Sequence, residues 1–254
     1  MSEVIGQQAE NTTFLNAQLL NTSGTPTWPD VFSQLATEAK DARLKQYYAT
    51  PMISGDTPLK DVPFVSIDFE TTGLNAQDDA ILTIGLVPFT LSRIQCSGSR
   101  HWVVNPNREL NEESVVIHGI TDSEVKNAPQ LDAILAQILE AMAGKIVLVH
   151  YKNIERQFFH HALINCIGEG IQFPVVDTLD IEYALQRQQC AGFFNWLKRK
   201  KPGSVRLGHA RERYGLPAYH PHHALTDALA TAELFQAQVQ YHFDPDMPLS
   251  ALWQ

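Results

Sequence analysis

The alternation of apolar and polar residues predicts a series of short buried strands and amphipathic helices from residue 62 onward. An almost continuous apolar run, Val62 to Ile67, is typical of a strand covered on both faces. Two β-like segments, 80–87 and 100–104, follow with turn residues between them, which indicates an antiparallel start. Later spacing predicts helices near 129–143, 153–165, 178–189, 206–214 and 223–241, with strands at 145–150 and 174–178. This order predicts an α/β domain with a mixed central sheet of about five strands, the first three antiparallel, and helices on both faces.

The pattern before residue 62 is weaker. Residues 1–26 are rich in Asn, Gln, Thr and Ser, which predicts a loosely held arm. Apolar residues from Val31 to Ala42 recur at helical spacing and predict one helix on the outside of the domain, followed by a proline-containing connector. We therefore expect an N-terminal extension at 1–60, a main domain at 61–242 and a C-terminal tail at 243–254.

Composition limits the kinds of partner and the compartment. A formal net charge of −9 excludes a basic nucleic-acid coat protein, so nucleic acid would need a local basic surface or a metal-bridged phosphate contact. The three cysteines are far apart and none forms a C-x-x-C pair, which favours a reducing cytoplasm. The sequence shows neither a signal-peptide pattern nor an apolar run near 18 residues, so we expect no membrane span.

Two acidic residues, Asp68 and Glu70, end the first buried strand. Because side chains two positions apart on a strand share a face, both carboxylates are expected on the same side. Two such acids repel each other, and their removal from water is unfavourable. A divalent cation such as Mg²⁺ would resolve this conflict. The alternative is an ordinary polar strand end with solvated acids.

Two more acids are candidates for the same site. Glu155 is expected in the first turn of its helix, where it could instead complement the helix dipole. Asp227 is expected within the first two turns of the last helix, where a solvated or capping aspartate is the alternative. Strand ends and helix starts converge in such a sheet, so these acids could meet Asp68 and Glu70. Two Mg²⁺ or Mn²⁺ ions about 3.5–4 Å apart would then neutralise the charge and hold a phosphodiester.

His222 lies five residues before Asp227, which corresponds to roughly 140° around a helix. The two side chains therefore cannot share one helix face, and Pro221 favours a position for His222 on the loop before the helix. A histidine on that loop is free to turn toward the acids. The alternative is an ordinary surface histidine.

Four short motifs occur in order along the chain: Asp68-Phe-Glu-Thr-Thr-Gly-Leu74, His118-Gly-Ile120, Asp177-Thr178 and His222-His-Ala-Leu-Thr-Asp227-Ala. Together they resemble the motifs of DEDD-type 3′–5′ exonucleases of the histidine subclass (DEDDh), akin to the proofreading, DnaQ-like epsilon subunit of bacterial DNA polymerase III. The resemblance covers about residues 62–240 and implies a ribonuclease H-like fold.

One motif departs from this family. Its second motif usually contains His-Asn-x-x-Phe-Asp, whereas this chain has His150-Tyr-Lys-Asn-Ile-Glu155. Glutamate reaches one methylene further than aspartate and still binds a hard cation. We therefore favour a variant metal site over an inactive one.

The resemblance implies a metal-dependent 3′–5′ exonuclease that hydrolyses terminal phosphodiesters of single-stranded or frayed DNA to nucleoside 5′-monophosphates. Asp68, Glu70, Glu155 and Asp227 would hold two Mg²⁺ or Mn²⁺ ions, with His222 as the general base. Contacts to the terminal nucleotide would come from Phe69, Thr71, Thr72, Gly73, Leu74 and His118. Core packing is the alternative role for Leu74 and His118, and Asp177 is expected to be a helix cap.

Two other functions remain open at this point. RNA or short oligonucleotides could replace DNA as substrate, or the domain could be a weakly active docking module on a polymerase or nucleotidyltransferase. Four consecutive cations, Lys198–Lys201, follow an aromatic stretch at 193–196 and suit a single strand, although a solvated basic loop would have the same composition. The oligomeric state is not predicted.

Overall fold

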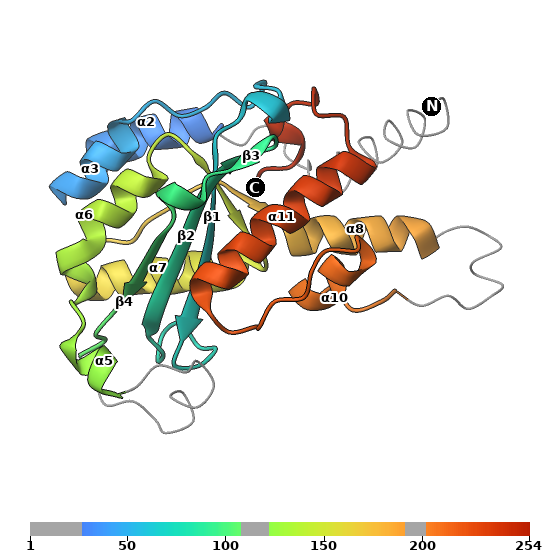
Figure 1. Ribbon diagram of the computed structural model, residues 1–254. Coiled ribbons are helices and arrows are strands. Elements are labelled where there is room, and N and C mark those ends of the chain that lie inside the picture. The colour runs from blue at the N-terminus through green and yellow to red at the C-terminus, as the bar shows by residue number, and fades with distance from the viewer. Residues whose placement is uncertain (1–26, 108–121, 191–201) are drawn as a thin grey trace.

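The computed structural model describes residues 27–107, 122–190 and 202–254 (Figure 1). Within these ranges a six-stranded mixed sheet has the order β3-β2-β1-β5-β6, and β4 also pairs with β2. The strands are β1 (Phe64–Thr71), β2 (Ile81–Thr90), β3 (Arg93–Ile94), β4 (Arg100–Val103), β5 (Ile146–Val149) and β6 (Val175–Asp177). β1 pairs antiparallel with β2 and parallel with β5, so the predicted mixed α/β sheet is confirmed.

Five helices lie close to their predicted positions: α6 (Leu131–Met142), α7 (Lys152–Ile167), α8 (Thr178–Cys190), α10 (Leu207–Arg213) and α11 (Ala224–His242). A short helix, α5 (Asp122–Asn127), precedes them, and 3₁₀ turns form at η1 (Leu59–Asp61), η2 (Cys96–Gly98) and η3 (Leu249–Ala251). None of the helices in the described ranges has the length and apolar character that a bilayer crossing requires.

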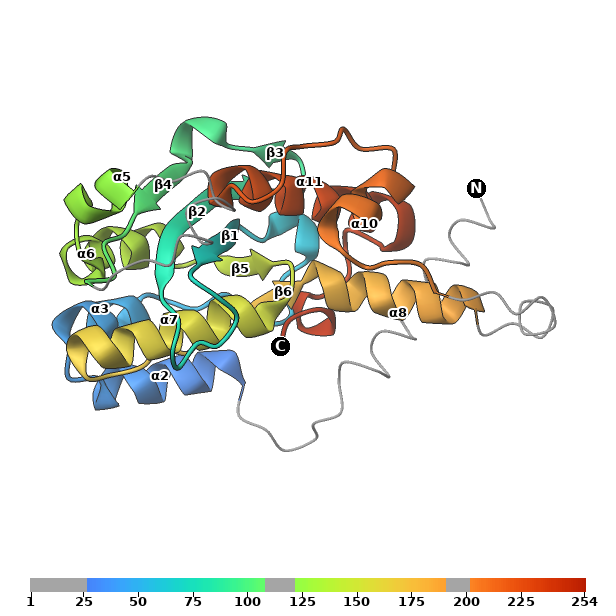
Figure 2. The same cartoon turned by 90° about the horizontal axis from the view of Figure 1, so that it is seen from below.

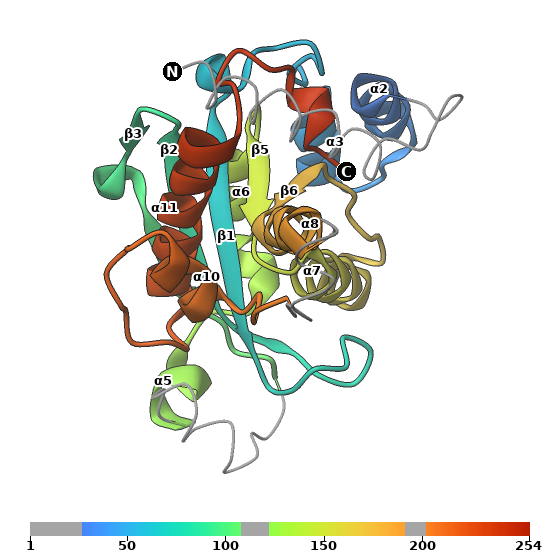
Figure 3. The same cartoon turned by 90° about the vertical axis from the view of Figure 1, so that its right-hand side faces the viewer.

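The sheet separates two apolar clusters. On one face Val65 and Ile67 of β1 pack with residues of α6 and α7, and Phe32 joins the same cluster. On the other face Phe64 stacks on Phe89 and meets the edge of Phe235 from α11. Figures 2 and 3 show α7 and α11 on opposite sides of the sheet. The strict alternation of β1 between these faces determines where its acidic residues point.

The prediction of a single N-terminal helix is wrong, because the chain forms two helices, α2 (Trp28–Glu38) and α3 (Ala42–Ala49). The carboxylate of Asp41 accepts the backbone N–H groups of Arg43, at 2.8 Å, and Leu44, at 3.4 Å, and so begins a new helix. The helical spacing of apolar residues continues across the break, which is why the pattern alone did not reveal it.

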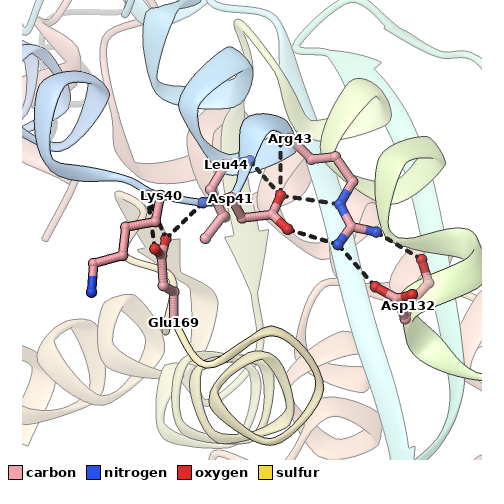
Figure 4. A network of polar contacts seen from close by, with 6 residues as sticks. All are labelled: Lys40, Asp41, Arg43, Leu44, Asp132 and Glu169. Atoms are coloured by element: carbon pink, nitrogen blue, oxygen red, sulfur yellow. Dashed lines mark hydrogen bonds and ion pairs between the residues drawn. The ribbon is translucent and has the colours of Figure 1, made fainter.

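An ionic network ties this pair of helices to the main domain (Figure 4). Arg43 donates to Asp41 and, at 2.8 Å, to Asp132 of α6. Glu169, just after α7, accepts the backbone N–H of Lys40 at 2.7 Å. Side chains from α2 and α3 also enter the apolar cluster beside α6 and α7. The two helices are therefore part of the packed structure.

Residues after α11 return to the connector that precedes β1. The backbone N–H of Leu59 donates to Met247 O at 3.0 Å, and that of Leu249 donates to Thr57 O at 2.9 Å. Gln254 exchanges two backbone hydrogen bonds with Val175, beside the outer edge of β6. The predicted arm at 1–26, the His118 element and the Lys198–Lys201 stretch lie outside the described residues.

Candidate active site

The end of β1 directs its two acids toward α11. Ile67 and Phe69 belong to the cluster that packs against α6 and α7, so Asp68 and Glu70 point to the opposite face. A register shift between Glu70 and Thr71 then ends the regular pairing with β2. The alternation expected from the sequence therefore places both carboxylates on one side.

A glycine in β2 lets α11 begin directly against this strand end. Gly85 is the register partner of Asp68, and a Cβ atom at Gly85 would lie 2.2 Å from the carbonyl carbon of Ala224. Only a residue without a side chain fits such a close approach between two backbones. Sequence analysis did not identify this residue, although a glycine in a buried strand is a known sign of close contact.

The first turn of α11 supplies the third acid. Asp227 Oδ2 accepts the backbone N–H groups of His222, at 2.8 Å, and His223, at 3.3 Å. These bonds turn the carboxylate back toward the start of the helix and toward β1. His223 is the N-cap residue, and its ring stacks on His101 of β4 at 4.8 Å between ring centroids.

His222 lies on the loop before α11, as its spacing predicted. Its φ angle of 68° is in the left-handed region, where a residue other than glycine is uncommon. The side chain is exposed. Burial raises the pKa of Asp227, and the backbone N–H groups and charges of His222 and His223 oppose this rise.

One carboxylate oxygen from each of Asp68, Glu70 and Asp227 lies within 4.8 Å of the other two. Burial, followed by the charges of Glu155, Asp227 and Glu70, raises the pKa of Asp68 well above its usual range. Burial and the neighbouring charge of Asp227 raise the pKa of Glu70 to about 7. The ionised forms of these carboxylates are therefore destabilised by burial and mutual repulsion, and a bound cation would remove this destabilisation.

Glu155, in the first turn of α7, is not one of the three acids whose oxygens lie within 4.8 Å of one another, but its charge acts on Asp68. Its side chain is only 2% exposed, and Oε2 has no hydrogen-bond partner among the residues that the structure describes. Burial raises the pKa of Glu155 well above its usual range, and Asp177 adds to this effect. Mg²⁺ and Mn²⁺ bind carboxylate oxygens, and a buried oxygen of this kind beside other acids is a suitable ligand. The residues therefore fit a divalent metal site.

Asp177 positions the start of α7. Its two carboxylate oxygens accept the backbone N–H groups of Tyr151, at 3.0 Å, and Lys152, at 2.8 Å. The same side chain accepts the N–H of Leu179 at 2.9 Å, so it caps α8 as well. The prediction that Asp177 is a helix cap is confirmed, and its capping of α7, the helix that carries Glu155, was not foreseen.

Tyr151, which replaces the family's usual amide, adopts φ 92° and ψ 74° at the N-cap of α7. The preceding residue, His150, contacts Thr178 through Nδ1 at 2.8 Å. Burial lowers the pKa of His150 to about 4, so its ring is neutral at physiological pH. The second motif is thus held by a strained backbone and by the Asp177-Thr178 pair.

A cavity of about 820 Å³ opens beside the acids. Its lining includes Asp68, His150, His222 and Asp227, and most of the other lining residues come from α10 and the loop that follows it. Nothing in the sequence pattern indicated that α10 would form its wall.

The residues predicted to contact the terminal nucleotide lie in different surroundings. Leu74 is 86% exposed, whereas Phe69 is buried against Phe159 on the α7 side of the sheet. Thr71 Oγ1 donates to Gly73 O at 2.6 Å, and Thr72 Oγ1 donates to Asp79 at 2.9 Å, so both threonines stabilise the turn after β1. His118 lies outside the described residues.

Comparison with known proteins gives a family match over residues 65–235, to the RNase T exonuclease family. A DNA polymerase III of the PolC type from Thermotoga maritima is 30% identical over 183 residues, which are 72% of this chain and 12% of that protein. The DNA polymerase III epsilon subunit of Treponema pallidum is 29% identical over 181 residues, covering 71% of this chain and 78% of that subunit. This chain therefore spans only a small part of the PolC-type relatives.

Solved structures share the fold at low identity. The nuclease domain of 3′hExo, a DEDDh family member bound to rAMP, has a TM-score of 0.56 at 17% identity, covering 70% of this chain and 92% of that one. Exonuclease I of E. coli with a dT13 oligonucleotide has a TM-score of 0.56 at 15% identity, covering 71% and 42%. The family match spans more than half of the chain and includes all four acids, so the protein belongs to the RNase T exonuclease family.

Proposed function

We propose that this protein is a metal-dependent 3′–5′ exonuclease acting on single-stranded or frayed DNA ends. The observation that carries the proposal is the cluster of carboxylate oxygens from Asp68, Glu70 and Asp227. Beside Asp68 lies Glu155, whose buried Oε2 has no hydrogen-bond partner within the described ranges. Carboxylate oxygens held this close together are ligands that two divalent ions would bind, and such a pair of ions suits phosphodiester hydrolysis.

In this proposal the four acids would hold two Mg²⁺ or Mn²⁺ ions. Such ions, when bound, lower the pKa of water and stabilise charge on the attacking and leaving oxygens. The choice between the two metals is left to experiment, because hard oxygen ligands accept either.

The remaining roles fall to side chains of this chain. His222 would accept a proton from the attacking water, because histidine is the most common general base and this one lies on an exposed loop beside Asp227. The neutral ring of His150 and the cap from Asp177 would keep α7 and Glu155 in place. The exposed Leu74 would contact the terminal base, and the cavity beside α10 would receive the strand.

DNA is the favoured substrate because the sequence relatives are DNA polymerase III proteins. The same relatives suggest a replicative polymerase as partner and a location in the cytoplasm. A preference for RNA would need contacts to the ribose 2′-hydroxyl, which are to be sought by assay.

The test uses 3′-labelled and 5′-labelled single strands of DNA and RNA with the same sequence. We expect stepwise shortening of the DNA from its 3′ end with Mg²⁺ or Mn²⁺, lost with EDTA. Asp68→Asn should abolish it and His222→Ala should reduce it to a small residual rate, whereas Asp246→Asn, in an exposed pair with Lys60, should leave it unchanged. Faster degradation of RNA would reverse the substrate preference. Absence of degradation with both metals would instead support a docking module.

A further inference from the structure

The loop that carries His222, residues 216–223, contacts a buried arginine of α10. Arg211 is 3% exposed. Its Nη1 donates to Ala230 O of α11 at 2.6 Å, and its Nη2 donates to Pro217 O of the loop at 2.9 Å. Nη2 also donates to Glu233 of α11 at 2.7 Å. A single guanidinium therefore joins α10, the loop and the helix that carries Asp227.

Tyr219 completes this contact from the loop. Its ring lies 4.6 Å from the guanidinium carbon of Arg211, and its hydroxyl donates to Glu233 Oε1 at 3.0 Å. The backbone N–H of Leu216 donates to Arg211 O at 3.1 Å. Three residues of the loop, 216, 217 and 219, are thus bound to the arginine or to its carboxylate partner, only a few positions before His222.

Regular structure does not position this loop. Residues 216–223 belong to neither a helix nor a strand, and the segment is bounded by left-handed backbone at Gly215 and His222. The cavity wall contains Arg211 together with Asp68, His222 and Asp227. Asp227 binds the backbone at the end of this loop, at His222 and His223, whereas the preceding part, residues 216–219, is held by Arg211 and its partner Glu233.

A buried arginine contributes little to the stability of a fold compared with an apolar residue. Apolar residues of similar volume often stabilise a site as well as a buried ion pair does, because the pair must be removed from water. The planar guanidinium instead offers several donors in fixed directions, which can hold separate carbonyl groups at once. Arg211 uses them on two main-chain carbonyls and one carboxylate.

We propose that Arg211 is a positioning residue for the nuclease reaction. Through Pro217, Tyr219 and Glu233 it holds the loop so that the His222 imidazole faces the metal-binding acids. Arg211 itself touches neither substrate nor metal in this proposal, which rests on the proposed function of His222 as the base.

The main test compares Arg211→Lys and Arg211→Met with Arg43→Met. Arg43 also pairs with two carboxylates, but on the outside of α3. We expect the single-turnover cleavage rate of the Arg211 variants to fall by about tenfold to a hundredfold, since a small misplacement of a reacting group has effects of this size. The KM and the affinity for Mn²⁺ should change by less than about twofold, because the acids stay in place. Arg43→Met should leave all three quantities unchanged.

A double-mutant cycle then asks whether Arg211 acts through His222. In a His222→Ala background, Arg211→Lys should reduce the residual rate no further. An equal loss in both backgrounds would overturn the positioning role. An unchanged rate for His222→Ala alone would instead refute the proposed base.

A third measurement does not depend on activity or on the Met variant folding. The His222 imidazole signal in ¹³C-labelled protein should shift or broaden in Arg211→Lys and stay unchanged in Arg43→Met. If the His222 signal is the same in wild type and Arg211→Lys, the arginine does not position the ring and the proposal fails.

Discussion

The two helices that complete the acidic cluster are held at their starts in different ways. At α7, Asp177 accepts backbone N–H groups directly, and β5 leads straight into the helix, so Glu155 is fixed by a strand end and a cap. At α11, Asp227 also accepts backbone N–H groups, but an irregular loop precedes the helix, and residues 216–219 of that loop are held by side chains gathered around Arg211. The difference suggests that disturbance at α7 affects metal binding first, whereas disturbance around α10 affects proton transfer first.

The largest expected effect comes from the repulsion among the acids that β1, α7 and α11 bring together. Acids with raised pKa values destabilise the metal-free fold above those pKa values, and protonation removes the penalty as pH falls. The raised values of Asp68 and Glu155, and that of Glu70 at about 7, predict that metal-free protein gains stability from about pH 8 to about pH 6.5. Buried His150 has the opposite effect at lower pH, because its folded pKa of about 4 lies below the unfolded value.

Thermal unfolding in EDTA at both pH values measures this gain, and added Mn²⁺ should raise the unfolding temperature more at the higher pH. Glu70→Gln should reduce the pH dependence. A midpoint in EDTA that is independent of pH would contradict the predicted repulsion.

The next prediction tests α11 alone, by changing the residue against which this helix begins. Gly85→Ala places a methyl group 2.2 Å from the backbone of Ala224, so α11 must move away from β1. We expect a loss of about 1–3 kcal/mol in the free energy of unfolding, as for other overpacked sites, and weaker Mn²⁺ binding because Asp227 moves with the helix. Urea unfolding and metal titration by calorimetry measure the two effects.

Gly208→Ala is the control for stability, since a Cβ there meets no atom within 4 Å. It should be neutral or stabilising by up to about 1 kcal/mol. Equal behaviour of the two variants would show that the close approach at Gly85 does not determine the position of α11.

A smaller loss should follow from Asp177→Asn. The amide can accept at only one oxygen, so part of the cap on α7 or α8 is lost, at about 1–2 kcal/mol. In contrast to Arg211→Lys, this variant should weaken Mn²⁺ binding, because it loosens the helix that carries Glu155. The comparison of helix starts fails if Asp177→Asn lowers the cleavage rate while the metal affinity stays at the wild-type level.

The smallest effect is a gain. Tyr151 has left-handed backbone, which is unfavourable by roughly 1–2 kcal/mol for most residues and milder for asparagine. Tyr151→Asn should therefore raise the melting temperature by about 2–4 °C. Tyr183→Asn, which removes an exposed tyrosine from the regular helix α8, should not. A lower melting temperature for Tyr151→Asn would mean that the tyrosine ring contributes more than its backbone loses.

Much of this arrangement could be predicted from local sequence. The face shared by Asp68 and Glu70 follows from strand alternation, and the loop position of His222 follows from its spacing to Asp227. Contacts between distant segments could not be predicted in the same way. Gly85 has a structural role because α11 begins against it, and Arg211 has one because three segments meet at its side chain. Neither contact changes the spacing of apolar residues along the sequence. The break at Asp41 was hidden because the apolar spacing continues through it.

The backbone pairing between residues 55–60 and 245–250 also has a consequence for biosynthesis. The connector leaves the ribosome long before its partner, and at about 5–20 residues per second the intervening chain takes roughly 10–40 s to make. From the synthesis of β6 until that of Gln254, the outer edge of β6 also lacks its partner, and an open strand edge can pair with another chain. These pairings therefore cannot form until residues 245–254 have been made, and slow translation before that point would favour aggregation.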